Sequence, residues 1–227
     1  MSIENNINLY TEKIKPFGTQ LIAVSKTKPN EDLLEAYAIG QRDFGENKVQ
    51  DMTAKWEALP KDIRWHMIGH LQRNKVKYIA PYVHLIQGVD SERLLVEINK
   101  QAEKNERTIP CLLQVFIGKD ETKFGFSEDE LLGFLNSEVF KNLKHIKISG
   151  LMGMATNTDD MAQVKTEFDG LRALSEKIKG EIIAANIEMK ELSMGMTNDY
   201  VQACEAGSTM VRIGSAIFGE RSYWYEP

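Results

Sequence analysis

The chain has 227 residues, of which 42% are hydrophobic and 27% are charged, and its formal net charge is -5 at pH 7. This composition is typical of a globular protein with a sizeable core, and the negative charge argues against a general nucleic-acid binder. No basic segment precedes a long apolar run at the start, and no stretch approaches the roughly 18 apolar residues of a membrane span. We therefore expect a cytoplasmic protein that binds no membrane. Cys111 and Cys204 fall in a predicted strand and a predicted helix, so we expect buried free thiols.

The apolar pattern predicts strands that alternate with helices along the chain. Helical spacing over residues 3–14 predicts a leading helix, a capping box at residues 127–130 begins another, and residues 161–178 have the clearest helical pattern. Strands are predicted at residues 21–24, 42–44, 63–68, 83–86, 110–117, 146–152, 188–193 and 209–213. About eight strand-helix units without a linker indicate a single α/β domain over residues 1–227. We expect a closed (β/α)8 TIM barrel with an extra N-terminal helix.

A lysine stands at the carboxyl end of the first predicted strand. Lys26 directly follows the apolar run at residues 21–24 and precedes the turn at residues 28–30. In a barrel, the carboxyl ends of all strands open at one mouth, where ligands and chemistry collect. A partly desolvated lysine there is suited to act as a nucleophile. From this stretch alone, a lysine that extends to solvent is the favoured alternative.

Small, glycine-containing turns follow the last two predicted strands. Gly195 lies in the turn at residues 194–197, and Gly214 and Ser215 follow the eighth strand. Backbone N–H groups at such turns commonly bind phosphate in this fold, although glycines that only serve tight turns are the alternative. A reactive lysine and a phosphate site in one mouth suggest a phosphorylated aldehyde held as a Schiff base. Pyridoxal 5'-phosphate (PLP) is the obvious candidate.

Six stretches carry a family resemblance, in order and at matching places: residues 23–29, 44–47, 65–75, 150–154, 192–197 and 211–219. They resemble the signature of the YggS/PROSC family of pyridoxal phosphate homeostasis proteins. The resemblance implies the barrel of the alanine racemase N-terminal domain without that enzyme's second, β-rich domain. It also implies a cofactor site made of Lys26, Asn47, His70, Met152, Ser193, Gly195, Thr197, Arg212, Gly214 and Ser215.

The resemblance implies a role for most of these residues. Lys26 would form the Schiff base, Asn47 would lie near the ring, and Arg212 would face the pyridine nitrogen. His70 and Met152 would line the pocket, and the serines and glycines after the last two strands would hold the phosphate. Thr197 and Ser215 depart mildly from the family pattern, but each keeps a hydroxyl. Lys123 resembles a loop lysine that has been linked to cofactor transfer, although a solvated loop lysine is the simpler description.

Arg212 separates the candidate functions. A protonated arginine beside the ring nitrogen keeps that nitrogen unprotonated and weakens the ring as an electron sink. Racemases on this scaffold use a second base from another domain, which we do not expect here. We therefore predict a non-catalytic monomer that stores and buffers PLP and delivers it, with PLP-dependent apoenzymes as candidate recipients. The alternatives are a racemase-like enzyme with Lys26 as base and, ranked lower, a metal pair of His66 and His70, which no carboxylate or thiol cluster completes.

Overall fold

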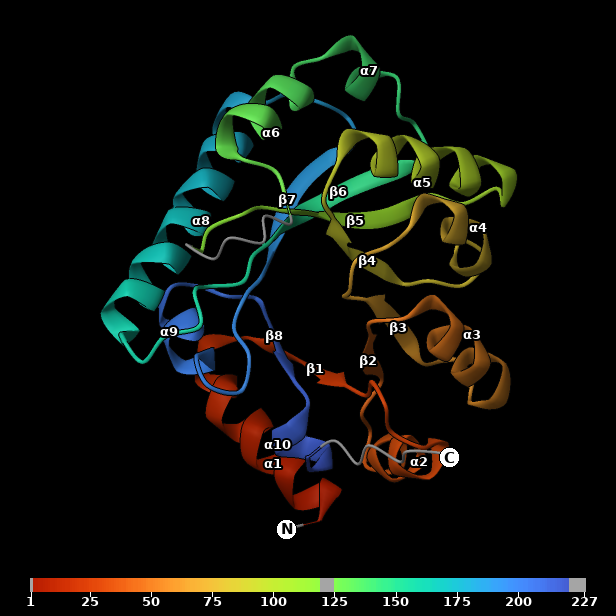
Figure 1. The fold of residues 1–227 in the computed structure, drawn as a ribbon, viewed down its shortest axis with the longest axis vertical. Helices are drawn as coiled ribbons and strands as arrows, with labels where there is room; N and C mark the ends of the chain where they lie inside the picture. The colour runs from red at the N-terminus through yellow and green to blue at the C-terminus, as the bar shows by residue number, and fades with distance from the viewer. Residues whose placement is uncertain (1, 119–124, 221–227) are drawn as a thin grey trace, which may run out of the picture.

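The computed structural model describes residues 2–118 and 125–220, and these ranges form a closed barrel of eight parallel strands in the order β1 to β8 (Figure 1). The predicted (β/α)8 barrel is thereby confirmed. β1 and β8 close it, with Ile22 opposite Arg212 in the register. The strands are β1 (Gln20–Val24), β2 (Asp43–Glu46), β3 (Arg64–Met67), β4 (Leu85–Val89), β5 (Ile109–Gln114), β6 (Ile146–Met152), β7 (Ile187–Ser193) and β8 (Met210–Ile213).

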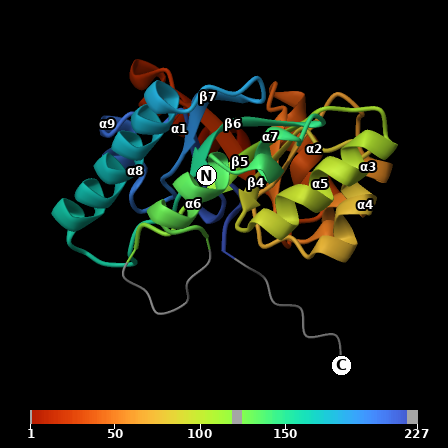
Figure 2. The same ribbon diagram turned by 90° about the horizontal axis from the view of Figure 1, so that it is seen from above.

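Helices surround the strands. Figures 1 and 2 show α8 and α9 on the opposite side of the barrel from α3, α4 and α5. The extra N-terminal helix, α1, precedes β1 as expected and packs against α2 and α10. The helices are α1 (Ile3–Ile14), η1 (Lys15–Phe17), α2 (Asn30–Ala38), α3 (Val49–Ala58), η2 (Arg73–Lys75), α4 (Val76–Ile79), α5 (Glu92–Lys104), α6 (Glu128–Leu135), α7 (Glu138–Lys141), α8 (Met161–Glu181), α9 (Tyr200–Glu205) and α10 (Ser215–Phe218).

Two apolar layers stabilise the barrel, because successive side chains of a strand point to opposite faces. The large outer layer lies between the strands and the helices, and α5 contributes Leu94, Leu95, Ile98 and Ala102 to it from one face. Fully burying one such leucine or isoleucine contributes about 1.5–3 kcal/mol. A separate cluster fills the barrel interior and consists of Ile22, Leu85, Leu112, Met152 and Met210.

Two strands extend further than the sequence pattern predicts, because their glycines lie inside the sheet. β2 continues through Gly45 to Glu46, and β4 continues through Gly88 to Val89. A Cβ atom on Gly88 would lie 2.7 Å from the carbonyl oxygen of Gly69, and one on Gly45 would lie 3.0 Å from Ile68 Cδ1. These glycines therefore permit close approach between neighbouring segments, whereas the predicted strands end before them.

The N-termini of α6 and α5 differ in their capping. The capping box is confirmed: Ser127 Oγ accepts from the Glu130 N–H at 3.3 Å, and Glu130 Oε2 accepts from the Ser127 N–H at 2.9 Å. Ser91 stands at the N-cap of α5, but its side chain makes no capping bond and donates to Asp90 Oδ1 instead. Cys111 and Cys204 are buried and free, as predicted. Within residues 2–118 and 125–220, no helix is long and apolar enough to cross a membrane.

Candidate functional site

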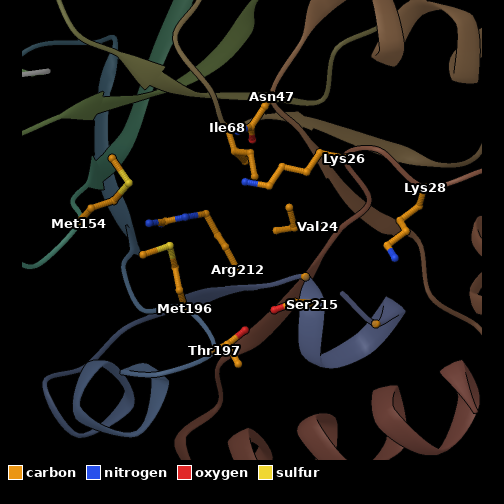
Figure 3. A pocket seen from close by; sticks show the side chains of 12 residues that line it. Val24, Lys26, Lys28, Asn47, Ile68, Met154, Met196, Thr197, Arg212 and Ser215 are labelled. Atoms are coloured by element: carbon orange, nitrogen blue, oxygen red, sulfur yellow. The ribbon is translucent and has the colours of Figure 1, made fainter. Parts of the chain in front are cut away.

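A cavity of about 240 Å³ opens at the carboxyl ends of the barrel strands (Figure 3). Its lining combines three cationic side chains with hydroxyl, amide and apolar groups, and the described residues of this lining include no carboxylate. The volume lies just below the roughly 300–1,000 Å³ of pockets for drug-sized ligands, so the cavity suits a small anionic molecule. The lining residues are Val24, Lys26, Lys28, Asn47, Ile68, Met154, Met196, Thr197, Arg212, Gly214, Ser215 and Gly219.

Lys26 reaches this cavity from a tight turn after β1. The Lys28 N–H donates to the Ser25 carbonyl at 3.1 Å, and Thr27 between them has a φ of 65°. A residue with a Cβ atom pays roughly 1–2 kcal/mol in this left-handed conformation, so the turn holds local strain beside the cavity. Figure 3 shows the Lys26 amine extending into the cavity while the Lys28 amine points away. Lys28 Nζ donates to the carbonyl oxygen of Glu220 at 2.9 Å.

A buried ion pair lies directly beneath the Lys26 turn. Lys55 Nζ on α3 lies 2.6 Å from Glu46 Oε1 on β2 and donates to the Ser25 carbonyl at 2.8 Å. Ser25 Oγ donates to the same carboxylate at 2.7 Å. Burial raises the pKa of the Glu46 carboxyl, and the Lys55 charge and the two hydrogen bonds act in the opposite direction. This network was not predicted from the sequence, although Glu46 lies inside one of the family stretches.

Arg212 is held rigidly although it is almost fully buried. Its Nη1 donates to Ser193 Oγ at 2.6 Å and its Nη2 donates to the Gly153 carbonyl at 3.1 Å. Burial lowers the pKa of the Arg212 guanidinium to about 10, and the charge of Asp199 partly opposes this shift. Arg212 therefore remains protonated at neutral pH and presents a fixed positive charge to the cavity.

The turns after β7 and β8 contribute hydroxyl groups and close backbone packing. Thr197 and Ser215 both line the cavity (Figure 3). A Cβ atom on Gly214 would lie 3.2 Å from both the Cβ atom and the carbonyl oxygen of Val24. Glycine at this position therefore lets the turn after β8 lie against the end of β1.

Four predicted site residues lie outside the cavity lining. Met152 belongs to the apolar cluster inside the barrel, and Ser193 is fully buried beneath Arg212. Gly195 has a φ of 94° and packs against Ala203, where a Cβ atom would lie 2.4 Å away. The His70 ring is more than half exposed, and its Nδ1 lies 2.8 Å from Asp90 Oδ2.

Several lining residues were not predicted from the sequence. Ile68 and Met154 line the cavity in place of His70 and Met152, two positions away in each case. Met196 and Val24 add further apolar surface. These residues lie inside or beside the family stretches, and that proximity is the only signal in the sequence that marks them. The predicted loop residue Lys123 lies outside the described residues.

The histidine pair that was considered for a metal is separated by its partners. The His66 ring is buried and lies 3.1 Å from Asp43 Oδ1, whereas the His70 ring contacts Asp90 at the surface. The two rings therefore face different surroundings, and this geometry gives no support to a metal site made from them.

Comparison with known proteins places the chain in a family. Residues 1–222 match the family model described as alanine racemase, N-terminal domain. A pyridoxal phosphate homeostasis protein of Haemophilus influenzae is 37% identical over 235 residues, which cover 98% of each chain. The chain belongs to the pyridoxal phosphate homeostasis protein family. A second member of that family, from Mus musculus, is 39% identical and is covered over 79% of its length.

Solved structures agree with this assignment to the pyridoxal phosphate homeostasis protein family. PipY from Synechococcus elongatus without PLP is 33% identical, with a TM-score of 0.89. PipY with PLP bound is 32% identical, with a TM-score of 0.85. Both alignments cover 96% of this chain and all of PipY. An alanine racemase of Bartonella henselae is 14% identical with a TM-score of 0.72, and it shares the fold over 60% of its own length.

Proposed function

We propose that this protein binds PLP in the cavity at the carboxyl end of the barrel and acts in PLP homeostasis by storing, buffering and delivering it. The observation that carries the proposal is the lining itself, which combines an amine, a buried guanidinium and two hydroxyls with apolar side chains. Cations and hydroxyl donors suit a phosphate, and apolar surface suits a flat ring. The names of the curated relatives and the PLP-bound PipY structure support the same ligand.

The polar groups that face the cavity have proposed tasks. Lys26 attacks the aldehyde carbon of PLP to form a Schiff base, with release of one water, and thereby tethers the ligand. Thr197, Ser215 and the backbone at Gly214 hold the phosphate, and Asn47 lies beside the ring. Arg212 faces the ring nitrogen. Ser193 acts one step away, because it holds Arg212 and does not line the cavity.

Arg212 also favours a carrier over an enzyme. When bound, PLP supplies an aldehyde for attachment and a ring that withdraws electrons most strongly when its nitrogen is protonated. With a pKa of about 10, Arg212 stays charged at neutral pH and can only donate to that nitrogen. The family relatives are named homeostasis proteins, which agrees with a non-catalytic role. We further propose a cytoplasmic, single-domain monomer over residues 1–227 that hands PLP to PLP-dependent apoenzymes.

Covalent trapping tests the tether. The purified protein is mixed with PLP, reduced with borohydride and digested, and the modified peptide is identified by mass spectrometry. We expect modification at Lys26 and its loss in Lys26→Ala, whereas Lys48→Ala, which removes an exposed lysine outside the cavity, behaves as the parent protein. A dominant adduct on another lysine contradicts the assignment.

Deuterium exchange separates the carrier from the racemase-like alternative, in which Lys26 is the catalytic base. The PLP-loaded protein is incubated in D2O with single-enantiomer amino acids, and exchange of the α-hydrogen is followed by NMR. We expect no sustained exchange above that of free PLP. Turnover that depends on Lys26 rejects the carrier and favours the enzyme.

A further inference from the structure

A continuous chain of buried hydrogen bonds connects the cavity to the opposite end of the barrel. Arg212 Nη1 donates to Ser193 Oγ at 2.6 Å, and Ser193 Oγ donates to Gln87 Oε1 at 2.6 Å. Gln87 Nε2 lies 3.0 Å from His66 Nδ1, and His66 Nε2 lies 3.1 Å from Asp43 Oδ1. We call these five residues the barrel relay.

The chemistry of the end groups sets one direction for every bond in the barrel relay. Arginine can only donate, so Ser193 uses its own proton toward the Gln87 carbonyl oxygen. The Gln87 amide nitrogen must then donate to His66 Nδ1, which leaves the ring proton on Nε2, where it meets the Asp43 carboxylate. With the amide and the ring placed as in the structure, these directions satisfy all four contacts.

The barrel relay crosses the interior of the barrel. Gln87 lies on β4 and Ser193 on β7, so their bond joins two strands that are not neighbours in the closed barrel. Each of the five residues is at most 5% exposed. Apolar side chains such as Leu85 and Met210 fill the same interior. Hydrogen bonds in such low-dielectric surroundings are strong and costly to break.

The far end of the barrel relay lies at the amino-terminal ends of β2 and β3. Asp43 begins β2, and Arg64 opposite it begins β3. Arg64 Nε donates to Asp43 Oδ1 at 2.7 Å, and its Nη2 donates to Asp43 Oδ2. Burial alone would raise the pKa of Asp43, but the bonds from Arg64 and His66 outweigh it and hold that pKa well below its usual range. The carboxylate is therefore a permanent anchor for the barrel relay.

We propose that the barrel relay is a positioning device that fixes the Arg212 guanidinium for ligand binding, and that Gln87, His66 and Asp43 therefore act on the cavity from a distance. The inference rests on the proposed PLP site. Ser193 Oγ is the acceptor that holds Arg212 Nη1. The other contact described for this hydroxyl is its bond to Gln87, so Gln87 fixes the position of Ser193. Loss of any member leaves a buried donor or acceptor unsatisfied and loosens the next one.

Metal binding is an alternative role for two of the same residues, Asp43 and His66. Asp43, His66 and His84 present possible ligand atoms within 4.8 Å of one another. Arg64, however, bonds both oxygens of Asp43, and the Nε2 proton of His66 points at the same carboxylate. A metal would have to displace both partners, so the arrangement favours the hydrogen-bonded relay over a metal site.

The test compares two buried glutamines in the barrel wall. Gln87→Met breaks the barrel relay with little change in volume, and Gln114→Met is the matched control on the neighbouring strand β5, outside the relay and outside the cavity lining. Two readouts are taken: PLP affinity by absorbance titration, and the ¹⁵N–¹H signal of the Arg212 side chain in the ligand-free protein. Thermal unfolding confirms that each variant is folded.

We expect Gln87→Met to weaken PLP binding roughly three- to tenfold, which corresponds to one net hydrogen bond, and to shift the Arg212 signal. Gln114→Met should change neither. If Gln87→Met does not fold, Arg64→Met replaces it in the test, because the Arg64 side chain is half-exposed. We expect this variant to change the same two readouts by a smaller amount. Equal behaviour of the two glutamine variants overturns the barrel relay. Absence of PLP binding in the parent protein overturns the proposed function instead, and the Arg212 signal then decides the relay alone.

Discussion

Replacing Lys55 with methionine removes the partner of a fully buried carboxylate. In the parent protein, Lys55 Nζ lies 2.6 Å from Glu46 Oε1 and 2.8 Å from the Ser25 carbonyl, and the Glu46 side chain has no exposed surface. In Lys55→Met, the Ser25 hydroxyl is the remaining described donor to that carboxylate. The substitution also releases the carbonyl that precedes Lys26, so it perturbs both stability and the cavity.

The cost follows from the burial. Removing one partner of a buried ion pair destabilises a protein by roughly 3–5 kcal/mol, because the other charge stays buried. For a chain of this length, each kcal/mol lowers Tm by about 2–4 °C, so we expect a decrease of about 6–20 °C at pH 7. Glu46→Gln combined with Lys55→Met removes both charges and should recover part of the loss.

The pH dependence of stability is a second, independent test of the buried pair. Burial raises the pKa of Glu46 in the folded protein, and loss of Lys55 removes the charge that opposes this shift. The folded state then binds more protons than the unfolded state between the unfolded pKa of about 4.3 and the raised folded value. Stability therefore decreases as pH rises through that window, and the deficit of Lys55→Met relative to the parent protein shrinks as pH falls toward about 4.3.

Urea and thermal unfolding at several pH values measure these effects. The matched control is Lys165→Met, which removes a half-exposed lysine that lies 2.7 Å from Asp169 on α8 and should cost about 0–1 kcal/mol. If Lys55→Met is as stable as this control, or if its loss of stability does not change with pH, the buried pair does not stabilise the fold by the amount expected.

Three further outcomes are expected. Gly150→Ala should prevent soluble expression, because its Cβ atom would lie 1.7 Å from the Glu191 carbonyl on β7, whereas Gly133→Ala, in open space on α6, should fold with a circular dichroism spectrum like that of the parent protein. Ser127→Ala removes the capping box and should cost about 1 kcal/mol in urea unfolding, with faster amide exchange at the start of α6. Cys111 is fully buried and burial raises its pKa, so a thiol reagent should modify it only after urea unfolds the protein.

The fold could be predicted because strands buried on both faces appear as short apolar runs between helical patterns. The ends of β2 and β4 could not, because Gly45 and Gly88 look like turn residues in isolation. Their role depends on a neighbouring segment, because a Cβ atom on Gly88 would collide with the Gly69 carbonyl and one on Gly45 would crowd Ile68. Such contacts depend on three-dimensional proximity, which periodicity does not encode.

The candidate site was predictable only as far as its strand ends. Lys26 and Arg212 stand at such ends and line the cavity. Neither periodicity nor spacing indicates which inward-facing residue meets which across a barrel, so the Gln87–Ser193 bond and the Lys55–Glu46 pair were missed. Residues that line the cavity could thus be predicted from the sequence more readily than the residues that hold them in place.

Those supporting groups explain how two cations are kept ready at one cavity. The Lys55–Glu46 pair fixes the carbonyl just before Lys26, and the barrel relay fixes Arg212 from the other side. The proposed phosphorylated ligand would therefore meet a guanidinium that is held in place by Ser193 and Gly153. Ordering a long, rotamer-rich side chain on binding costs about 0.5–1.5 kcal/mol, and the bonds from Arg212 to Ser193 and Gly153 reduce that cost for Arg212. We therefore expect the buried polar network of this barrel to raise the affinity for the proposed ligand through preorganisation, although most of its members lie outside the cavity lining.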